Sequence, residues 1–394
     1  MKIGRSSALL LGIALLVSGC WSRREVNEVT ISSALAIDQE SEQEIRVTMQ
    51  VLQPTTTGES GVPRPTVFNV TATGKTTADA LRNLNQVLSR RPEWKHNNAI
   101  ILGEAVARQG VSDALDFFVR DHESRLDQWL LVTHGRAADV LVPRFKLEPN
   151  QGVGIRRLNR NAVRLTARTV PIRLYDFMLS LTNPPEAPLA AGVETVQFPD
   201  PSNEERLTQR LRIAGTAVFR QDRLAGWLDE SESRGLQWLR GHITGPMLVV
   251  PCRKGPGQGI GVEVMRVRAK LRAQWQGTLP TVRVMVNVSA KLGDLMCPED
   301  LSQRQAQHDL QYRTAALIEA EIENVLERLQ HDLVADPVGI ATAIERRFPA
   351  QWKQLRPRWD EVFPKIKVKP EVAVELEQTG ITVGKPLPGG SGAR

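Results

Sequence analysis

The residue types that carry enzyme chemistry are all present in this chain, but not at the spacings that the chemistry requires. A catalytic site needs a nucleophile or a metal with a base in reach. The six histidines follow no zinc-binding pattern, because HExxH and paired CxxC motifs are absent, and there is no GxSxG nucleophile elbow. Gly74-Lys75-Thr76 would end a phosphate loop only with a glycine at position 69, where Asn69 stands. The sequence therefore predicts a protein that is not an enzyme and holds no metal or cofactor.

One cysteine near the N-terminus has a chemical setting of its own. Lys2 and Arg5 precede an apolar run of ten residues, 8–17, and the small residues Ser18 and Gly19 stand directly before Cys20. As a helix this run would span about 15 Å, half of the ~30 Å hydrocarbon core of a bilayer. A basic start, a short apolar core and a small-residue cleavage region are typical of an export signal.

The segment Val17-Ser18-Gly19-Cys20 resembles the lipobox of bacterial lipoproteins. The resemblance implies that diacylglycerol is attached to the Cys20 sulfur and that the chain is cut between Gly19 and Cys20. One acyl chain gives only marginal membrane binding, whereas two give stable anchoring. We therefore expect residues 1–19 to be a lipoprotein signal peptide, and membrane lipid, held through a diacylglyceryl cysteine, to be a partner. The alternative is an ordinary signal peptide followed by a chance cysteine.

The rest of the chain has the composition of a folded body outside the bilayer. Hydrophobic residues make up 41% and charged residues 24%, which are ordinary values for a globular protein. No second apolar run approaches the ~20 residues of a spanning helix. The net charge of +7 falls to +5 when residues 1–19 are removed, because Lys2 and Arg5 leave with them and no acid does. The basic residues are spread along the sequence, so nucleic acid is not an expected partner.

The hydrophobic pattern predicts an α+β fold with three mixed α/β domains built on mainly antiparallel sheets. Segments 44–53 and 281–291 alternate apolar and polar residues, as half-buried strands do. Segments 211–220 and 224–228 predict a hairpin, and segment 170–181 predicts a helix. A long helix is expected over 298–333, in the C-terminal domain.

Stretches rich in proline and glycine divide the expected body. Residues 183–190 contain three prolines, and residues 253–261 alternate glycine with other residues, so neither stretch can continue a helix. We expect an N-terminal α/β domain over 20–188, a small β-rich middle domain over 189–256 and a C-terminal domain over 257–383, followed by a disordered tail, 384–394. Cys252 and Cys297 could form a disulfide or remain two free thiols, and the sequence leaves both open.

Several short sequence motifs follow one another along the chain in a fixed order. They are Gly19-Cys20-Trp21 with 24–27 (REVN) and Ile37-Asp38, then 100–104 (IILGE), 115–120 (LDFFVR), 215–220 (GTAVFR), 224–229 (LAGWLD), 238–241 (WLRG), 348–353 (FPAQWK) and 359–364 (WDEVFP). Together they resemble the C-subunit lipoproteins of spore-germination nutrient receptors, from the lipid site almost to the C-terminal tail. Ser22 departs from the family, which usually has Asp there, and so does the neighbourhood of His96.

The resemblance implies a non-enzymatic receptor subunit, lipid-anchored on the outer face of the spore inner membrane. It would act with integral-membrane A and B subunits to trigger germination in response to nutrients. An alternative is a lipid-anchored solute-binding protein of a transporter, although such proteins alternate strands and helices in two lobes, whereas this chain groups its strands. A third hypothesis is an envelope hydrolase with two carboxylates hidden among the 44 acidic residues.

Five residues at the expected hairpin-to-helix junction form the candidate partner-contact site: Trp227, Asp229, Glu232, Arg234 and Trp238. The acidic and basic members could dock a partner, but capping and ion pairing at the helix start is the interpretation that we favour. The two tryptophans suit either a domain core or a hot spot for another subunit. Trp352 and Trp359 carry the same ambiguity.

Overall fold

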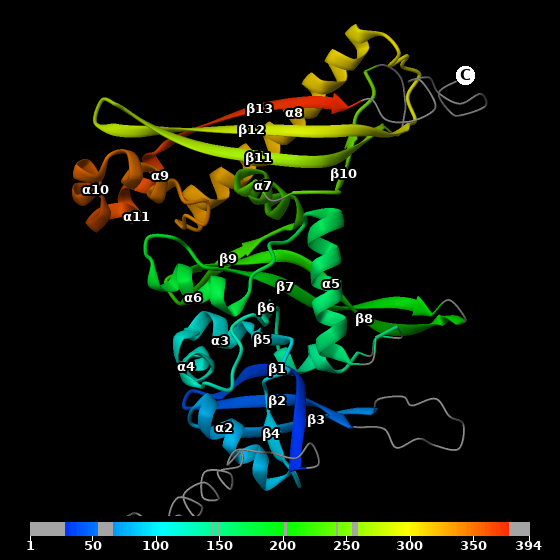
Figure 1. The fold of residues 1–394 in the computed structure, drawn as a ribbon, viewed down its shortest axis with the longest axis vertical. Helices are drawn as coiled ribbons and strands as arrows, with labels where there is room; N and C mark the ends of the chain where they lie inside the picture. Colours follow the sequence, from blue (N-terminus) through cyan, green and yellow to red (C-terminus); the bar gives the residue numbers. More distant parts are fainter. Residues whose placement is uncertain are drawn as a thin grey trace, which may run out of the picture.

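The computed structural model describes residues 28–53, 66–143, 145, 147–148, 150–200, 203–241, 243–253 and 259–377. The expected signal peptide, the cleavage and lipidation site at Gly19 and Cys20, and the tail 384–394 lie outside these residues. The described residues form two β-sheets that follow one another along the long axis of the molecule (Figure 1). Among them, no helix combines the length and the apolar character that crossing a membrane requires.

The larger sheet has nine strands in the order β3-β2-β1-β5-β6-β7-β8-β9, with β4 pairing β1 off this path. The outer parts of the sheet are antiparallel, and β1, β5, β6 and β7 run parallel in its middle. The strands are β1 Val29–Ser41, β2 Glu44–Gln53, β3 Thr66–Gly74, β4 Arg91–Glu93, β5 Ala99–Gly103, β6 Trp129–Thr133, β7 Leu189–Asp200, β8 Asn203–Arg220 and β9 Arg223–Leu228.

Helices cover both faces of this sheet, which is why β5 is buried along its whole length. Ile100 and Leu102 of β5 pack in one core with α2 Thr77–Asn83, α3 Glu104–Gln109, α4 Ser112–Arg120 and α6 Leu174–Thr182. Ile101 packs in a second core with α5 Gln151–Thr166 and the 3-10 turn η3 Ala137–Leu141. A further 3-10 turn, η2 Leu84–Gln86, follows α2.

The smaller sheet has the order β10-β11-β12-β13, with β10 Met247–Val250, β11 Ile260–Gln276, β12 Leu279–Leu295 and β13 Lys367–Glu377. Strands β11 and β12 form a long antiparallel hairpin, and β13 joins β12 in parallel. The inward valines of β12 pack with α7 Glu230–Arg240 and α8 Arg304–Glu327, which a π turn, η4 Arg328–Asp332, extends. The shorter elements α9 Ile340–Arg347, α10 Pro349–Leu355, η5 Arg356–Arg358, α11 Trp359–Val362 and η6 Phe363–Lys365 lie at one end of the sheet (Figure 1).

The expected α+β class, with mainly antiparallel sheets and a long C-terminal helix, is confirmed. Two helix starts were placed too early: α8 begins at Arg304 rather than at 298, and α6 begins at Leu174 rather than at 170. Residues 170–173 are instead extended, because the Leu130 N–H donates to the Ile172 carbonyl at 3.0 Å. Strand β7 begins at the expected boundary, residue 189, but pairs with β6 in the same sheet. The domain boundaries stay a prediction.

The two cysteines that the sequence left open form a disulfide. The Cα atoms of Cys252 and Cys297 lie 5.6 Å apart, within the usual range for such a bond. Cys252 follows β10 and Cys297 follows β12, so the bond joins the edge of the smaller sheet to the chain that leads into α8.

Candidate functional site

The hairpin-to-helix junction is a capped helix start. Strand β9 ends at Leu228, and Asp229 precedes the first turn of α7. An oxygen of the Asp229 side chain accepts the Glu232 N–H at 2.7 Å, while a Glu232 carboxylate oxygen accepts the Asp229 N–H at 2.9 Å. This reciprocal capping box satisfies N–H groups that a helix start otherwise leaves without partners. Both acidic side chains are therefore held in fixed positions at the end of β9.

Arg234 and Trp238 point the other way, from α7 to α8 of the same chain. Arg234 Nε and Trp238 Nε1 both donate to Glu321 Oε2, at 2.9 and 2.8 Å. Trp238 is fully buried, and the side chains of Arg234 and Glu321 are 16% and 8% exposed. The hydrogen bond to Glu321 raises the pKa of Arg234 above its usual value. At Gly235 a Cβ would lie 2.4 Å from the Glu321 carbonyl oxygen, so glycine permits the close approach of the two helices.

The remaining junction residues line an acidic groove of about 650 Å³ between the larger sheet and the end of α8. We call this the acidic groove; its charged lining consists of Glu194, Asp229, Glu230, Glu232, Glu327 and Asp332, against Arg212 and Arg328. Arg212 bridges Glu194 and Glu230 at 2.5 and 3.0 Å. Glu327 and Asp332 have side chains that are 75% and 57% exposed. Arg328 pairs with Asp332 at 2.6 Å and Arg168 pairs with Glu230 at 2.6 Å, so six carboxylates meet three arginines and the groove keeps a surplus of negative charge.

An aromatic pair forms one wall of the acidic groove. The rings of Trp227 and His134 stack with their centroids 4.0 Å apart. His134 Nδ1 lies 3.2 Å from a Glu104 carboxylate oxygen, which fixes the orientation of its ring. Trp227 Nε1 is buried and has no hydrogen-bond partner among the described residues. An indole face beside several carboxylates is a setting in which a basic side chain binds well.

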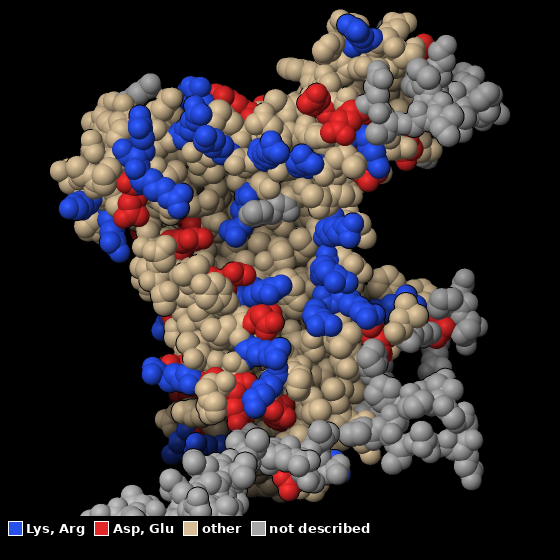
Figure 2. All heavy atoms as spheres, viewed as in Figure 1, with Lys and Arg blue, Asp and Glu red and all other residues tan. Residues whose placement is uncertain are grey.

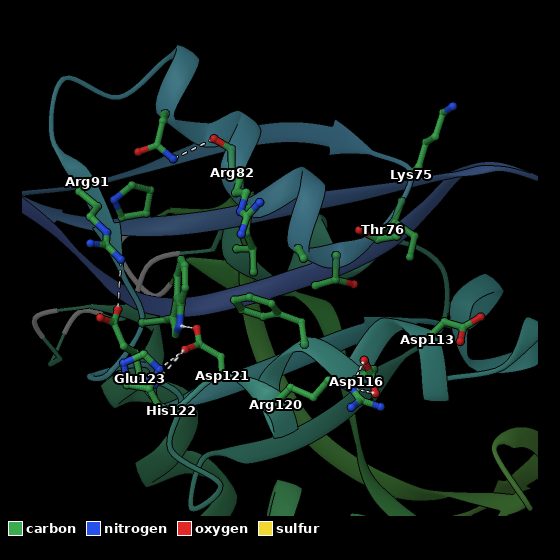
Figure 3. A pocket seen from close by; sticks show the side chains of 18 residues that line it. Lys75, Thr76, Arg82, Arg91, Asp113, Asp116, Arg120, Asp121, His122 and Glu123 are labelled. Atoms are coloured by element: carbon green, nitrogen blue, oxygen red, sulfur yellow. Dashed lines mark hydrogen bonds and ion pairs between the residues drawn. The ribbon is translucent and has the colours of Figure 1, made fainter.

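A second hollow, of about 830 Å³, lies between α2 and α4 and is formed partly by the segment 115–123. Figure 3 shows Arg82 and Arg91 on one side of it, and Asp121 and Glu123 on the other. Arg91 approaches Glu123 to 3.7 Å across the hollow. Trp94 Nε1 donates to Asp121 at 2.8 Å, and the Trp94 ring meets Phe117 edge to face. These contacts fasten the turn after α4 to β4.

Two buried acids, Asp38 and Asp336, accept hydrogen bonds from the backbone. Asp38 accepts the N–H groups of Ala137 and Ala138 at 2.6 and 3.0 Å, and burial raises its pKa. Burial likewise raises the pKa of Asp336 to about 6, while this carboxylate accepts four backbone N–H groups at the start of α9. No group of His, Cys, Asp and Glu side chains in the described part of the chain could hold a metal ion.

The structure thus separates the five predicted contact residues into two sets. Trp227, Asp229 and Glu232 line the acidic groove, whereas Arg234 and Trp238 lock α7 onto α8 behind it. Sequence reasoning missed their partners His134 and Glu321, because they lie more than eighty residues away and carry no local signal. Trp352 and Trp359 are both buried and meet edge to face, with ring centroids 5.1 Å apart.

Comparisons with known proteins agree with one another. The family model described as "Spore germination protein N-terminal domain" matches residues 22–195, and the one described as "Spore germination B3/ GerAC like, C-terminal" matches residues 214–380. Among the relatives, spore germination protein B3 of Bacillus subtilis (strain 168) is 25% identical over 98% of this chain and its own full length. The putative spore germination protein YfkR of the same organism is 27% identical over 95% of this chain and 96% of its own length.

The fold also has a counterpart among solved structures. The crystal structure of the GerBC protein matches with a TM-score of 0.56 and 20% identity, over 88% of this chain and 97% of that one. The two family models together extend over most of the chain, from residue 22 to residue 380 with a gap at 196–213. The chain therefore belongs to the GerAC-like family of spore germination proteins.

Proposed function

We propose that this chain is the lipid-anchored C-subunit of a spore nutrient germinant receptor, which acts with integral-membrane A and B subunits to trigger germination. The observation that carries the proposal is the lipobox-like sequence at 17–20, which stands directly before a body that matches the germination family over residues 22–195 and 214–380. The chain would be held by a diacylglyceryl Cys20 on the outer face of the spore inner membrane. Its contribution would be contact with its partners rather than catalysis.

We further propose that the acidic groove receives a basic segment of a partner subunit. Trp227 would offer its ring face, and Asp229 and Glu232, held by their capping box, would offer fixed charge. Glu327 and Asp332 at the rim are exposed enough to steer such a segment into place. Arg234 and Trp238 would act indirectly, by holding α7 and thereby the floor of the groove.

The anchor is tested by Cys20→Ala in sporulating cells, followed by fractionation of spore membranes and mass spectrometry of the mature N-terminus. We expect the variant body to be folded but lost from the membrane fraction, and nutrient-triggered germination to be impaired. Ser22→Ala is the matched control, because it changes a neighbouring residue and spares the sulfur. An unmodified thiol in the native protein, or full membrane retention of the Cys20 variant, would contradict the proposal.

The groove is tested separately, with the anchor intact. The double variant Glu327→Lys/Asp332→Lys reverses two exposed charges at the rim, and we expect it to reduce co-purification of the polytopic subunits from spore membranes at least tenfold. Glu42→Lys/Asp127→Lys makes the same change of charge at exposed positions outside the groove. Equal co-purification of the two variants would show that partners bind elsewhere.

The transporter alternative is not favoured. Solute-binding proteins of transporters close two lobes of alternating strands and helices over a ligand. Here a nine-stranded mixed sheet is followed by a second sheet with one long hairpin, and the family matches are to germination proteins.

A further inference from the structure

The positive charge of the chain gathers in one place in the fold. Segments 266–283 and 340–369 contain thirteen Lys or Arg and only three Asp or Glu, a net charge of +10 against +7 for the whole chain. The two segments lie side by side: Trp275 packs on Phe348 with ring centroids 5.6 Å apart, and Arg283 of β12 stands beside Lys369 of β13. We call this surface the basic lobe. The basic residues look evenly spread in the sequence because the lobe is assembled from two distant segments.

Within the lobe, cations of neighbouring strands stand close together, and Arg283 pairs with Glu371 of β13 at 3.0 Å. Arg268, Lys270 and Arg272 alternate along β11 and are exposed on the open face of the smaller sheet. Arg272 lies directly opposite Arg283, an arrangement that destabilises an antiparallel pair. The open face of the smaller sheet therefore carries adjacent cations from two strands.

Between β11 and α9 the lobe is hollowed. This hollow, of about 900 Å³, is lined by Lys270, Arg272, Arg346 and Arg347, with Glu186 as its acid. Within the described residues, none of these four cations has a carboxylate partner at ion-pair distance. The hollow therefore has an unneutralised positive potential, which an anion would relieve.

Helix α5 adds a second group of cations. Arg156, Arg160 and Arg164 recur every four residues, so they line one side of the helix, and all three are exposed. Arg157 pairs with Glu148 at 2.8 Å, but the other three have no carboxylate partner within the part of the chain that the structure describes. Figure 2 shows Lys and Arg gathered over the smaller sheet and over α5 on one broad face of the molecule, viewed along its shortest axis.

We propose that this broad face, with the basic lobe and the arginines of α5, lies on an anionic lipid surface. The cations stand on an open sheet face and an exposed helix, which suits an extended planar partner better than a small ligand. Three aromatic rings of the lobe are turned inward, Trp352, Trp359 and Phe363 being 2, 5 and 1% exposed, whereas Trp275 and Phe348 are half-buried and pack on each other. Basic residues close to an anionic bilayer each add attraction, which decays within a Debye length.

The orientation that follows is specific. Strand β1 starts the described chain at one end of the long axis, and the basic lobe is at the other end (Figure 1). A lipid anchor before β1 and a basic face farther along would be two separate contacts, so the body would lie along the membrane. The choice of lipid as the partner rests on the proposed anchor, but the test below does not use the anchor.

The test measures binding of the mature-length chain, residues 20–394 with Cys20→Ala, to vesicles by co-sedimentation. Vesicles of phosphatidylcholine are compared with vesicles that contain 30% phosphatidylglycerol, at 50 and 300 mM salt. We expect the partition coefficient to rise at least tenfold with the anionic lipid and to fall at least fivefold at the higher salt.

Two variants with the same net charge locate the contact. Lys270→Gln/Arg272→Gln/Arg346→Gln/Arg347→Gln is expected to lose at least tenfold in partitioning and to keep the native circular dichroism. The control Arg82→Gln/Arg90→Gln/Arg125→Gln/Arg223→Gln removes four exposed cations elsewhere and should bind within twofold of the native chain. Equal loss in both variants, no preference for phosphatidylglycerol, or binding to a DNA oligonucleotide in place of vesicles would overturn the proposal. Because no acyl chain is present, failure here leaves the anchor itself untouched.

Discussion

Glu321 is the residue whose removal should most disturb the junction between the two sheets. Its carboxylate accepts hydrogen bonds from Arg234 and Trp238, and all three side chains are buried or nearly so. Glu321→Ala would leave a guanidinium without its counter-charge and a buried indole N–H without an acceptor. Breaking a buried ion pair from one side typically costs about 3–5 kcal/mol, and an unsatisfied buried donor about 1–3 kcal/mol. Since both effects arise from one group, we expect a loss of about 4 kcal/mol in the free energy of unfolding.

The assay is urea unfolding of the mature-length chain, followed by near-ultraviolet circular dichroism and tryptophan fluorescence. Glu321→Gln keeps one acceptor oxygen and should lose about 2 kcal/mol. Glu327→Gln, on the same helix but with a 75% exposed side chain, should change stability by less than ~0.5 kcal/mol. Arg234→Met combined with Glu321→Leu removes both charges and should recover the part of the loss that the unpaired guanidinium causes, while the Trp238 indole N–H still lacks an acceptor. A loss below ~1 kcal/mol for Glu321→Ala would refute the reasoning that the triad joins α7 to α8.

Three further predictions concern groups whose surroundings are equally well defined. Burial raises the pKa of Asp336 to about 6 from 3.8, so its charged form is disfavoured in the folded state. The unfolding free energy should therefore fall by at most ~3 kcal/mol as the pH rises from about 4 to about 6. Urea midpoints of the native chain and of Asp336→Asn at pH 4.5 and 7 check this, because the variant lacks that contribution. Replacing Cys252 and Cys297 together by serine opens a loop that the disulfide closes across 45 residues. The free energy of unfolding should fall by about 2–4 kcal/mol, measured as a lower thermal midpoint. An unchanged midpoint would mean that the disulfide does not stabilise the protein. Gly235→Ala places a methyl group 2.4 Å from a backbone oxygen of α8 and should destabilise the protein by ~1–3 kcal/mol in the same unfolding assay, and an unchanged unfolding free energy would contradict this close approach of the two helices.

The sequence predicted the elements that depend on local pattern. Strand β2 has the expected bounds because its residues alternate cleanly, and the hairpin of β8 and β9 follows from a short polar turn between apolar runs. Helix α5 was not expected, because its exposed side is crowded with arginines and its buried residues include glycines and a fully buried Asn159. Such a helix owes its stability to the sheet that it covers, which no local window contains.

The candidate site also combines features that local spacing predicts with features that depend on distant residues. The capping of α7 by Asp229 and Glu232 depends on residues three apart, so spacing alone was enough to suggest it. The acidic groove depends on Trp227 meeting His134 and on the end of α8, contacts that span about ninety residues or more. The basic lobe was hidden for the same reason, because its charge density appears only when β11 and β13 stand on either side of β12.

The parallel pairing of β13 with β12 also constrains when the smaller sheet can form. The last strand of the described chain closes one edge of that sheet along eleven residue pairs, Thr281 to Lys291 of β12 opposite Lys367 to Glu377 of β13. Until residue 377 has been synthesised, β12 has an unpaired edge with which strands of other chains could form hydrogen bonds. Folding of this half is therefore completed only after nearly the entire polypeptide is available, and chains that stop short of β13 should be prone to aggregation and proteolysis even though every other element is intact.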